Sequence, residues 1–455
     1  YSDGAGSGAA MVDAFTDLSV PSFFVSGDLD VDGTTNLDAV DVDGAVNFAA
    51  DVTFADGADI ITASAGTSNT RIGVNAGNSI TSGGNFNVVV GDEAGTALTT
   101  GDSNIAIGYE SLKTEDEHGT NIAIGQAALK VLNAGADGGN VAIGHTAGTA
   151  MTTGIRHVLI GGLAGKALTS GDKNIAIGYS ALQSDTLGSR SVAIGHDALQ
   201  AQNFTTATTA YNTAVGEAAG LSVTTGVQNT LIGALAGDAL TTGNRNTALG
   251  YSALSSDTLG DRNVAIGNLA LQTQNFTTST DSYNTAVGYN AGGAITTGQN
   301  NTIVGGLAGD ALTDTDNNTA VGYAALSADT LGINSTAIGA GALSSQNFTT
   351  ATDSHNVAVG VNAGLSVTTG DSNTLLGNFS GDALTTGKNN TAIGRDALGA
   401  DTLGKASVAV GRAALGSQNF TTETNAYNVG VGNSAGGAIT TGQYNTLLGG
   451  LAGDA

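Results

Sequence analysis

Short apolar triplets alternate with polar, glycine-rich connections along most of the chain, and the alternation keeps a nearly constant interval. Each repeat carries the same five-residue phrase: usually Asn, then Val, Ile or Thr, then usually Ala, then Ile, Val or Leu, then Gly, as in residues 212–216. The phrase occurs 22 times between residues 69 and 455, mostly 17 residues apart. Such a period is typical of a solenoid, whose units bury their apolar faces only against neighbouring units.

A longer period is superimposed on the short one. The step from one phrase to the next lengthens to 21 residues after Gly195, Gly267, Gly339 and Gly411, which produces a unit of 72 residues. We therefore predict an all-β fold, a parallel β-roll or β-solenoid of about 22 coils over residues 63–455, each coil made of two short strands and two turns. Residues 1–62 lack the phrase and are predicted to be a separate β-rich attachment segment. At about 4.8 Å per coil the solenoid would be a rod roughly 100 Å long.

The apolar positions within the phrase predict two buried faces. The second and fourth positions are apolar or threonine in every copy, and residues two apart share one face of a strand. We expect them to point into the coil. The third position then points outward, yet it is also apolar, and only Arg71 is charged there. A single rod would expose this row as a long apolar stripe. The pattern therefore favours a parallel bundle of identical chains, with three chains preferred over two.

Asparagine opens 18 of the 22 phrases, and Ser191, Ser335, Ser407 and His157 replace it in the others. Amide side chains stacked along an axis can form hydrogen-bonded ladders. We predict such a ladder, represented by Asn212, Asn229, Asn246 and Asn263. The alternative is N-glycosylation, because Asn300, Asn317 and Asn389 each precede Asn-Thr.

The four longer steps contain related insertions that begin with Gln-Asn-Phe-Thr-Thr, one every four coils. We expect the insertions to bulge from the same edge of the rod, roughly 19 Å apart. Their aromatic side chains could be platforms that bind glycans on a surface receptor, or each Phe could plug its own loop or a groove between chains. The candidate residues of these loops are Phe204, Tyr211, Phe276, Tyr283, Phe348, His355, Phe420 and Tyr427.

Composition narrows the functional classes. The formal net charge is −26, and the 13 Lys and Arg residues form no run, so a nucleic-acid surface is excluded. No apolar segment approaches the ~20 residues that a membrane-spanning helix needs, so membrane insertion is not expected. Cysteine does not occur, so thiolate sites are excluded. Because 451–455 stop inside a repeat and solenoids normally carry atypical terminal caps, further sequence is expected beyond one or both ends.

Candidate chemistry is sparse. Asp28, Asp30 and Asp32 resemble the start of a calcium loop, but Ala39 stands where such a loop needs a bidentate Glu. An acidic face of a strand is the preferred interpretation. The five histidines share no spacing typical of a metal site. No nucleophile elbow or phosphate-binding glycine loop occurs. We predict a protein that is not an enzyme and has no metal or cofactor site.

The phrase, seen as Ser191-Val192-Ala193-Ile194-Gly195 or as residues 407–411, resembles the head repeat of trimeric autotransporter adhesins. That family folds as a trimer of left-handed parallel β-rolls. The resemblance implies that the aliphatic side chains fill the roll, and that Ala193 and its equivalents approach the trimer axis. The adhesin repeat is nearer 14 residues, whereas this one has 17.

A second resemblance is to phage tail-fibre-like proteins. It is carried by the Asn-Thr-Ala-Ile/Leu-Gly phrase with Ala-Leu downstream at residues 246–254 and 390–398, and by residues 27–38. Together the two resemblances imply a homotrimeric virion tail-fibre shaft involved in host-surface attachment, with a host glycan or protein as receptor. The alternatives are a bacterial extracellular or cell-surface adhesin of the autotransporter type and a self-polymerising extracellular filament.

Overall fold

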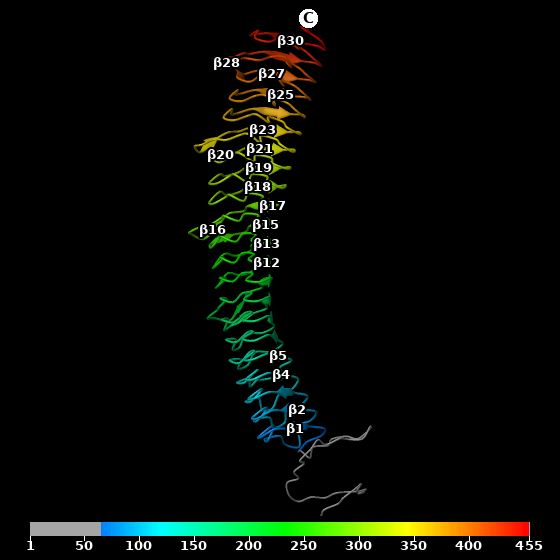
Figure 1. Cartoon of the computed structure of the whole chain (residues 1–455), viewed down its shortest axis with the longest axis vertical. Coiled ribbons are helices and arrows are strands. Elements are labelled where there is room, and N and C mark those ends of the chain that lie inside the picture. Colours follow the sequence, from blue (N-terminus) through cyan, green and yellow to red (C-terminus); the bar gives the residue numbers. More distant parts are fainter. Residues whose placement is uncertain (1–64, 455) are drawn as a thin grey trace, which may run out of the picture. The chain divides into compact units, whose positions relative to one another are not determined.

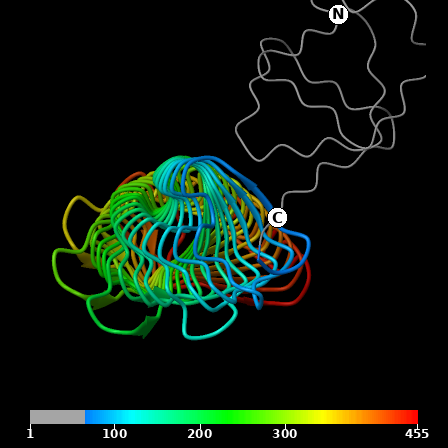
Figure 2. The same cartoon turned by 90° about the horizontal axis from the view of Figure 1, so that it is seen from below.

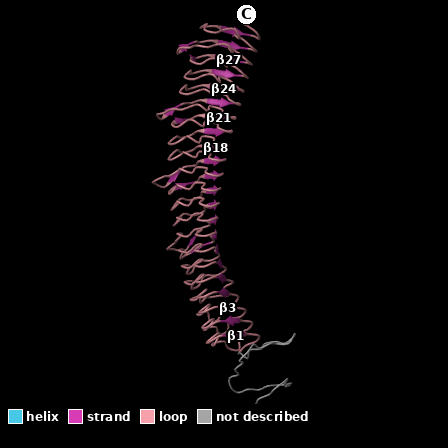
Figure 3. Cartoon of the chain, in the orientation of Figure 1, coloured by secondary structure: helices cyan, strands magenta, loops and turns pink. Residues whose placement is uncertain are grey.

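The structure is a computed structural model that describes residues 65–454. The predicted attachment segment of residues 1–62 and the acidic run from Asp28 to Asp32 lie outside the described residues. The described part is an all-β solenoid without a helix, and its coils stack into one gently curved rod (Figures 1 and 3). This confirms the predicted parallel β-solenoid of about 22 coils.

One long parallel sheet runs the length of the rod. Each coil contributes one three-residue strand, which is formed by positions two to four of the phrase and pairs in register with the same positions of the next coil, as Thr213 does with Thr230. The strands are β1 (Thr70–Ile72), β2 (Val88–Val90), β3 (Ile105–Ile107), β4 (Ile122–Ile124), β5 (Val141–Ile143), β6 (Val158–Ile160), β7 (Ile175–Ile177), β9 (Val192–Ile194), β11 (Thr213–Val215), β12 (Thr230–Ile232), β13 (Thr247–Leu249), β15 (Val264–Ile266), β17 (Thr285–Val287), β18 (Thr302–Val304), β19 (Thr319–Val321), β21 (Thr336–Ile338), β23 (Val357–Val359), β24 (Thr374–Leu376), β25 (Thr391–Ile393), β27 (Val408–Val410), β29 (Val429–Val431) and β30 (Thr446–Leu448).

Among the coils that the structure describes, a second pairing of strands occurs only at the insertions. There a two-residue strand of the insertion pairs in parallel with the preceding coil. The prediction of two strands in every coil is therefore wrong, because the remaining segments pass from coil to coil through turns. The pairs are β8 (Gly188–Ser189) with β10 (Thr208–Thr209), β14 (Gly260–Asp261) with β16 (Thr280–Asp281), β20 (Gly332–Ile333) with β22 (Thr352–Asp353), and β26 (Gly404–Lys405) with β28 (Thr424–Asn425).

The two faces of the long sheet are the reverse of the prediction. The third position points into the coil, and Ala193 is fully buried. Val192 and Ile194 lie on the outer face and keep intermediate exposure. The same pattern, with only the middle residue fully buried, recurs along the sheet. The implied approach of Ala193 to a trimer axis is therefore wrong, and the row that faces outward consists of the second and fourth positions.

The coil interior explains this arrangement, because it is too narrow for bulky side chains from both sides. The residue four after the phrase glycine also points inward and alternates in pairs between Gly and Leu. Opposite Leu254 and Leu271, which are fully buried, the strands carry only Ala248 and Ala265. Where this residue is Gly237, the strand carries Leu231 instead, and a Cβ added to Gly237 would lie 2.8 Å from the Leu231 side chain. Small and large residues thus alternate in filling the core, as close packing requires.

The phrase glycine marks the end of each strand, and its lack of a side chain permits the coils to stack. Gly250 has a φ of +140°, and a Cβ added to it would lie 2.5 Å from the carbonyl oxygen of Gly267 in the next coil. No L side chain fits that space without displacing backbone. The column of glycines therefore sets the coil-to-coil spacing.

We expect Gly250→Ala to destabilise the rod by about 3 kcal/mol or more, because it combines an unfavourable φ with a backbone collision. Urea unfolding followed by circular dichroism measures the change. Gly306→Ala is the matched control, because its φ lies outside the left-handed region and the nearest atom to an added Cβ is 3.8 Å away, on Tyr323. Equal losses in the two variants would contradict the role of the glycine column.

Candidate functional site

The predicted stack of asparagines is present, but its main hydrogen bonds run from each side chain to the backbone of the next coil and not, as predicted, from each side chain to the next. The Asn229 side-chain oxygen accepts the backbone N–H of Asn246 in the next coil at 3.0 Å, and its amide nitrogen donates to the Gly243 carbonyl at 2.8 Å. Asn212 and Asn246 accept the N–H groups of Asn229 and Asn263 in the same way, both at 2.9 Å. These side chains are buried, so the ladder satisfies backbone groups that water cannot reach.

His157 reproduces the asparagine pattern with an imidazole ring. Its Nδ1 accepts the N–H of Asn174 at 3.2 Å, and its Nε2 lies 2.6 Å from the Gly171 carbonyl. Nδ1 can accept and Nε2–H can donate only in one neutral tautomer. Burial lowers the pKa of His157, while its bond to Gly171 and the nearby Asp172 act in the opposite direction. The sequence pattern marked His157 as an exception, and the structure shows that it performs the same task.

The insertion loops divide their aromatic residues between inside and outside. The phenylalanines are only 4–6% exposed, which agrees with the interpretation that each plugs its own loop. They are Phe204, Phe276, Phe348 and Phe420. The candidates before the ladder asparagine are exposed: Tyr211, Tyr283, Tyr427 and His355. Only this second group offers its rings to a partner.

Each insertion is anchored by a buried polar network that the sequence analysis missed. The Asp185 carboxylate accepts the Gln202 amide at 2.6 Å and the backbone N–H groups of Gly188 at 3.0 Å and Phe204 at 3.2 Å. Asn212 in turn donates to Gln202 at 2.8 Å. The same Asp–Gln–Asn chain recurs in the other three insertions. Burial raises the pKa of Asp185, against these hydrogen bonds.

A sequence signal for this network was present in the exceptions to the ladder. Ser191 accepts the Gln202 amide at 3.0 Å, and Ser407 accepts that of Gln418 at the same distance. Ser335 does so for Gln346 at 2.9 Å. Serine thus takes the ladder position beside the glutamine in three of the four coils before an insertion, whereas Asn263 is retained beside Gln274 in the fourth.

The outer face of the long sheet is the largest candidate interaction surface. We call it the sheet face and define it by the second and fourth positions of the phrase. Every fourth position is Ile, Val or Leu, and some of these side chains are well exposed, such as Leu249 at 44% and Leu376 at 46%. The second position is mostly Val or Ile up to β9 and mostly Thr from β11 onward. The row of fourth positions is therefore apolar along the whole rod, and the row of second positions is apolar mainly in the first third.

Tyrosines line both edges of the sheet face. All nine tyrosines of the described region are exposed, and each occupies the position just before the phrase or just after its glycine. Tyr427 stacks on Tyr444 of the next coil with centroids 5.5 Å apart, and the Arg190 guanidinium lies 5.6 Å from the centroid of the Tyr211 ring. Those before the phrase are Tyr211, Tyr283, Tyr427 and Tyr444; those after the glycine are Tyr109, Tyr179, Tyr251, Tyr289 and Tyr323.

Charge is distributed unevenly around the rod. The same two edge positions hold seven of the 13 Lys and Arg residues but only Asp92 and Glu217 of the 27 Asp and Glu residues that lie between residues 65 and 454. The seven are Arg156, Lys173, Arg190, Arg245, Arg262, Arg395 and Arg412. The excess negative charge therefore lies away from the sheet face.

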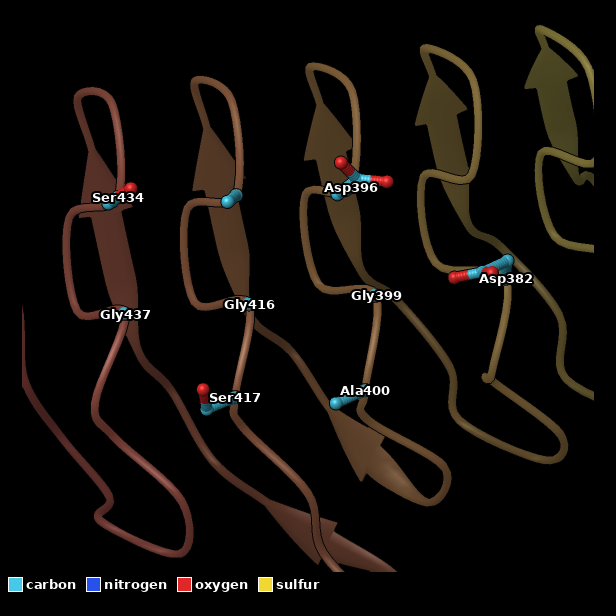
Figure 4. Close-up of a pocket in the computed structure, with 9 residues that line it drawn as sticks. Asp382, Asp396, Gly399, Ala400, Gly416, Ser417, Ser434 and Gly437 are labelled. Carbon is cyan, nitrogen blue, oxygen red and sulfur yellow. The ribbon is translucent and has the colours of Figure 1, made fainter.

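A hollow of about 450 Å³ lies on the outside of the rod across four successive coils (Figure 4). Small residues such as Gly399, Ala400 and Gly416 create it, and Asp382 and Asp396 are its only ionisable lining residues. Burial raises the pKa of Asp382, and the nearby Asp396 adds to the effect. The lining contains no histidine or lysine that could act with them as a base.

The insertions do not form a straight row. Seen along the rod, the loops project in different directions because successive coils are rotated (Figure 2). Each insertion leaves its coil at the equivalent position, as expected, but the insertions do not lie in one straight line along the rod. The exposed residues Tyr211, Tyr283, His355 and Tyr427 belong to these loops, one every four coils, and the loops are distributed around the shaft.

Glu115, Asp116 and His118 were not singled out from the sequence, which showed no metal-type spacing among histidines. The structure places one possible ligand atom from each within 4.8 Å of the others. The remaining histidines are the ladder residue His157 and the exposed His145, His196 and His355. The one sequence signal for the cluster is local: two carboxylates lie within three residues of a histidine.

Comparison with known proteins places the chain in no family: no protein-family model matches it, and no curated protein sequence matches it. Within residues 65–454 there is no helix with the length and apolar character to cross a membrane.

The structure predicts that His157 makes the rod sensitive to mild acid. Because its folded pKa lies below the ordinary 6.5, the unfolded chain binds the proton first, and stability is lost as the pH falls from 6.5 toward the folded pKa. His157→Asn restores the ladder residue without a titrating ring. From pH 7.5 to pH 5, the unfolding free energy of the wild type should fall by about 1–2 kcal/mol relative to this variant. An unchanged difference at the two pH values would contradict the neutral ring.

Proposed function

We propose that this chain is a structural fibre protein, the shaft of a phage tail fibre in the virion, which acts as a parallel homotrimer and takes part in attachment to the host surface. The observation that supports it most directly is the sheet face, an apolar surface repeated on every coil of a rigid rod. A monomer would leave this surface in water, whereas soluble monomers rarely expose apolar patches of more than a few hundred Å².

The sheet face is large enough for a stable interface. Twenty-two coils spaced about 4.8 Å apart, each with a three-residue strand about 10 Å long, correspond to an area on the order of 1,000 Å² per chain. Specific protein interfaces bury about 800 Å² per partner. Because identical coils recur along the rod, parallel chains could meet through the same residues at every level.

The charge distribution favours a second copy of the chain as the partner. The rod of residues 65–454 contains 27 Asp and Glu residues against 13 Lys and Arg residues, so two rods repel each other most where their carboxylates meet. The sheet face and its edges carry few acidic residues and most of the positive charge, so contact there keeps the acidic sides apart. The tyrosines that follow the phrase glycine, such as Tyr109 and Tyr251, match the composition of protein interfaces, whereas the tyrosines of the insertions stay outside the proposed contact. The number three rests on the resemblance to trimeric adhesin heads.

Attachment to the host would use what remains outside such a bundle. The exposed tyrosines of the insertions, such as Tyr211 and Tyr283, are amphipathic rings that could stack on a glycan or contact a receptor protein. Their distribution around the shaft suits repeated weak contacts, in which linked sites strengthen one another. This shaft role needs neither a cofactor nor a catalytic group.

Fractionation of the natural source tests the assignment to a virion. A lysate is separated on a density gradient and probed with an antibody against residues 65–454. We expect the chain to co-sediment with phage particles and the antibody to label their fibres in electron micrographs. Recovery with the outer membrane of uninfected cells would contradict the proposal in favour of a surface adhesin. Free filaments of unlimited length would contradict it in favour of a self-polymerising protein.

A further inference from the structure

One buried carboxylate lacks the partner that its equivalents have. Glu115 lies three residues after Leu112, just as Asp185 lies three after Leu182. Asp185 receives an amide from Gln202, but the residue equivalent to Gln202 in the coil after Glu115 is Leu132, which is fully buried and has no polar group. The usual amide donor to the carboxylate is therefore replaced by hydrocarbon.

The remaining contacts of Glu115 compensate its charge only in part. Its side chain is fully buried, and its two oxygens accept the backbone N–H groups of His118 at 3.2 Å and Ala134 at 3.0 Å. A buried carboxylate normally needs a charged partner or a fuller set of donors. The position thus favours a cation close to the Glu115 oxygens.

His118 is an unusual residue at its place in the coil. The equivalent residues are Gly188, Gly260, Gly332 and Gly404, where an added Cβ would collide with the aspartate carboxylate. The ring of His118 instead lies beside Glu115, with its Nδ1 3.4 Å from the nearer oxygen. That nitrogen is shielded from water and, beyond this contact with the Glu115 carboxylate, has no hydrogen-bond partner. It is therefore directed at an undercompensated carboxylate.

Asp116 completes the cluster. One of its oxygens accepts the Glu117 N–H at 2.7 Å, and its carboxylate lies within the same 4.8 Å group as the Glu115 and His118 ligand atoms. Asp116 and His118 are only half-buried, so an ion could enter from solvent. Within residues 65–454, no other three His, Asp or Glu side chains bring their possible ligand atoms so close together.

We propose that Glu115, Asp116 and His118 form a binding site for a divalent transition metal ion of the zinc type. One imidazole nitrogen and two carboxylates suit zinc, whereas calcium and magnesium prefer oxygen ligands alone. In the insertions, the amide of Gln202 or its equivalent donates to the buried carboxylate. At Glu115, a bound ion would compensate the carboxylate instead by supplying positive charge. It would also tie together a turn in the first third of the rod, where the regular insertion network is missing from this coil.

Calorimetric titration with zinc chloride tests the site. The full chain is first treated with a chelator and transferred to metal-free buffer at pH 7. We expect one tight site per chain that is weakened by at least about tenfold in His118→Ala and in Asp116→Asn. His145→Ala is the matched control, because His145 is exposed and lies outside the cluster, and it should bind as the wild type does. Circular dichroism checks that each variant keeps its fold.

Two results would overturn the proposal. Identical titrations of the wild type and both cluster variants would show that any zinc binds elsewhere. An equal response to magnesium would contradict the ligand chemistry. A loss of zinc binding in Asp116→Asn with the circular dichroism spectrum unchanged would support the site independently of the buried residues.

Discussion

Parallel stacking of equivalent residues at about 4.8 Å is the constraint on which the rest of this structure depends. Every side chain near the backbone meets a copy or close relative of itself above and below. Gly250 lies against Gly267, so neither tolerates a Cβ. Asn229 accepts the backbone N–H of Asn246 in the next coil, so a side chain that can accept this hydrogen bond is favoured there. Each residue must therefore suit both its own strand or turn and the equivalent residue of the next coil, and this double constraint recurs at every coil.

The same constraint separates interior from surface. Because the coil is narrow, its core is filled by alternating small and large residues, as Leu231 opposite Gly237 shows. The β-branched side chains of the phrase are consequently on the outside, where they stack into continuous apolar columns. The backbone hydrogen bonds are made within the chain, but the sheet face still exposes apolar side chains to water. The tyrosines and the few positive charges gather at the edges of that face, which links the packing of one chain to the proposed assembly of several.

Much of the fold follows from the sequence, and the part that does not has a physical reason. The period, the coil number and the asparagine ladder could be predicted because each depends on residues a fixed distance apart. The direction of the faces could not, since the second, third and fourth positions are all apolar and alternation does not distinguish inside from outside. The Gly-Gly-Leu-Leu alternation did indicate which face of the strand points inward. It did so only through the volumes of residues that face each other across the coil. The Asp185–Gln202–Asn212 network and the Glu115 cluster join side chains from different segments, and no single spacing indicates them.

The central claim is that the sheet face is covered by other copies of the chain. Sedimentation of the purified protein over a wide range of concentrations tests this claim most directly, because it gives the absolute mass of the particle. The account predicts a constant mass near three times 44.3 kDa. A mass of 44.3 kDa at every concentration would contradict it, because the apolar columns would then be stable in water without a partner.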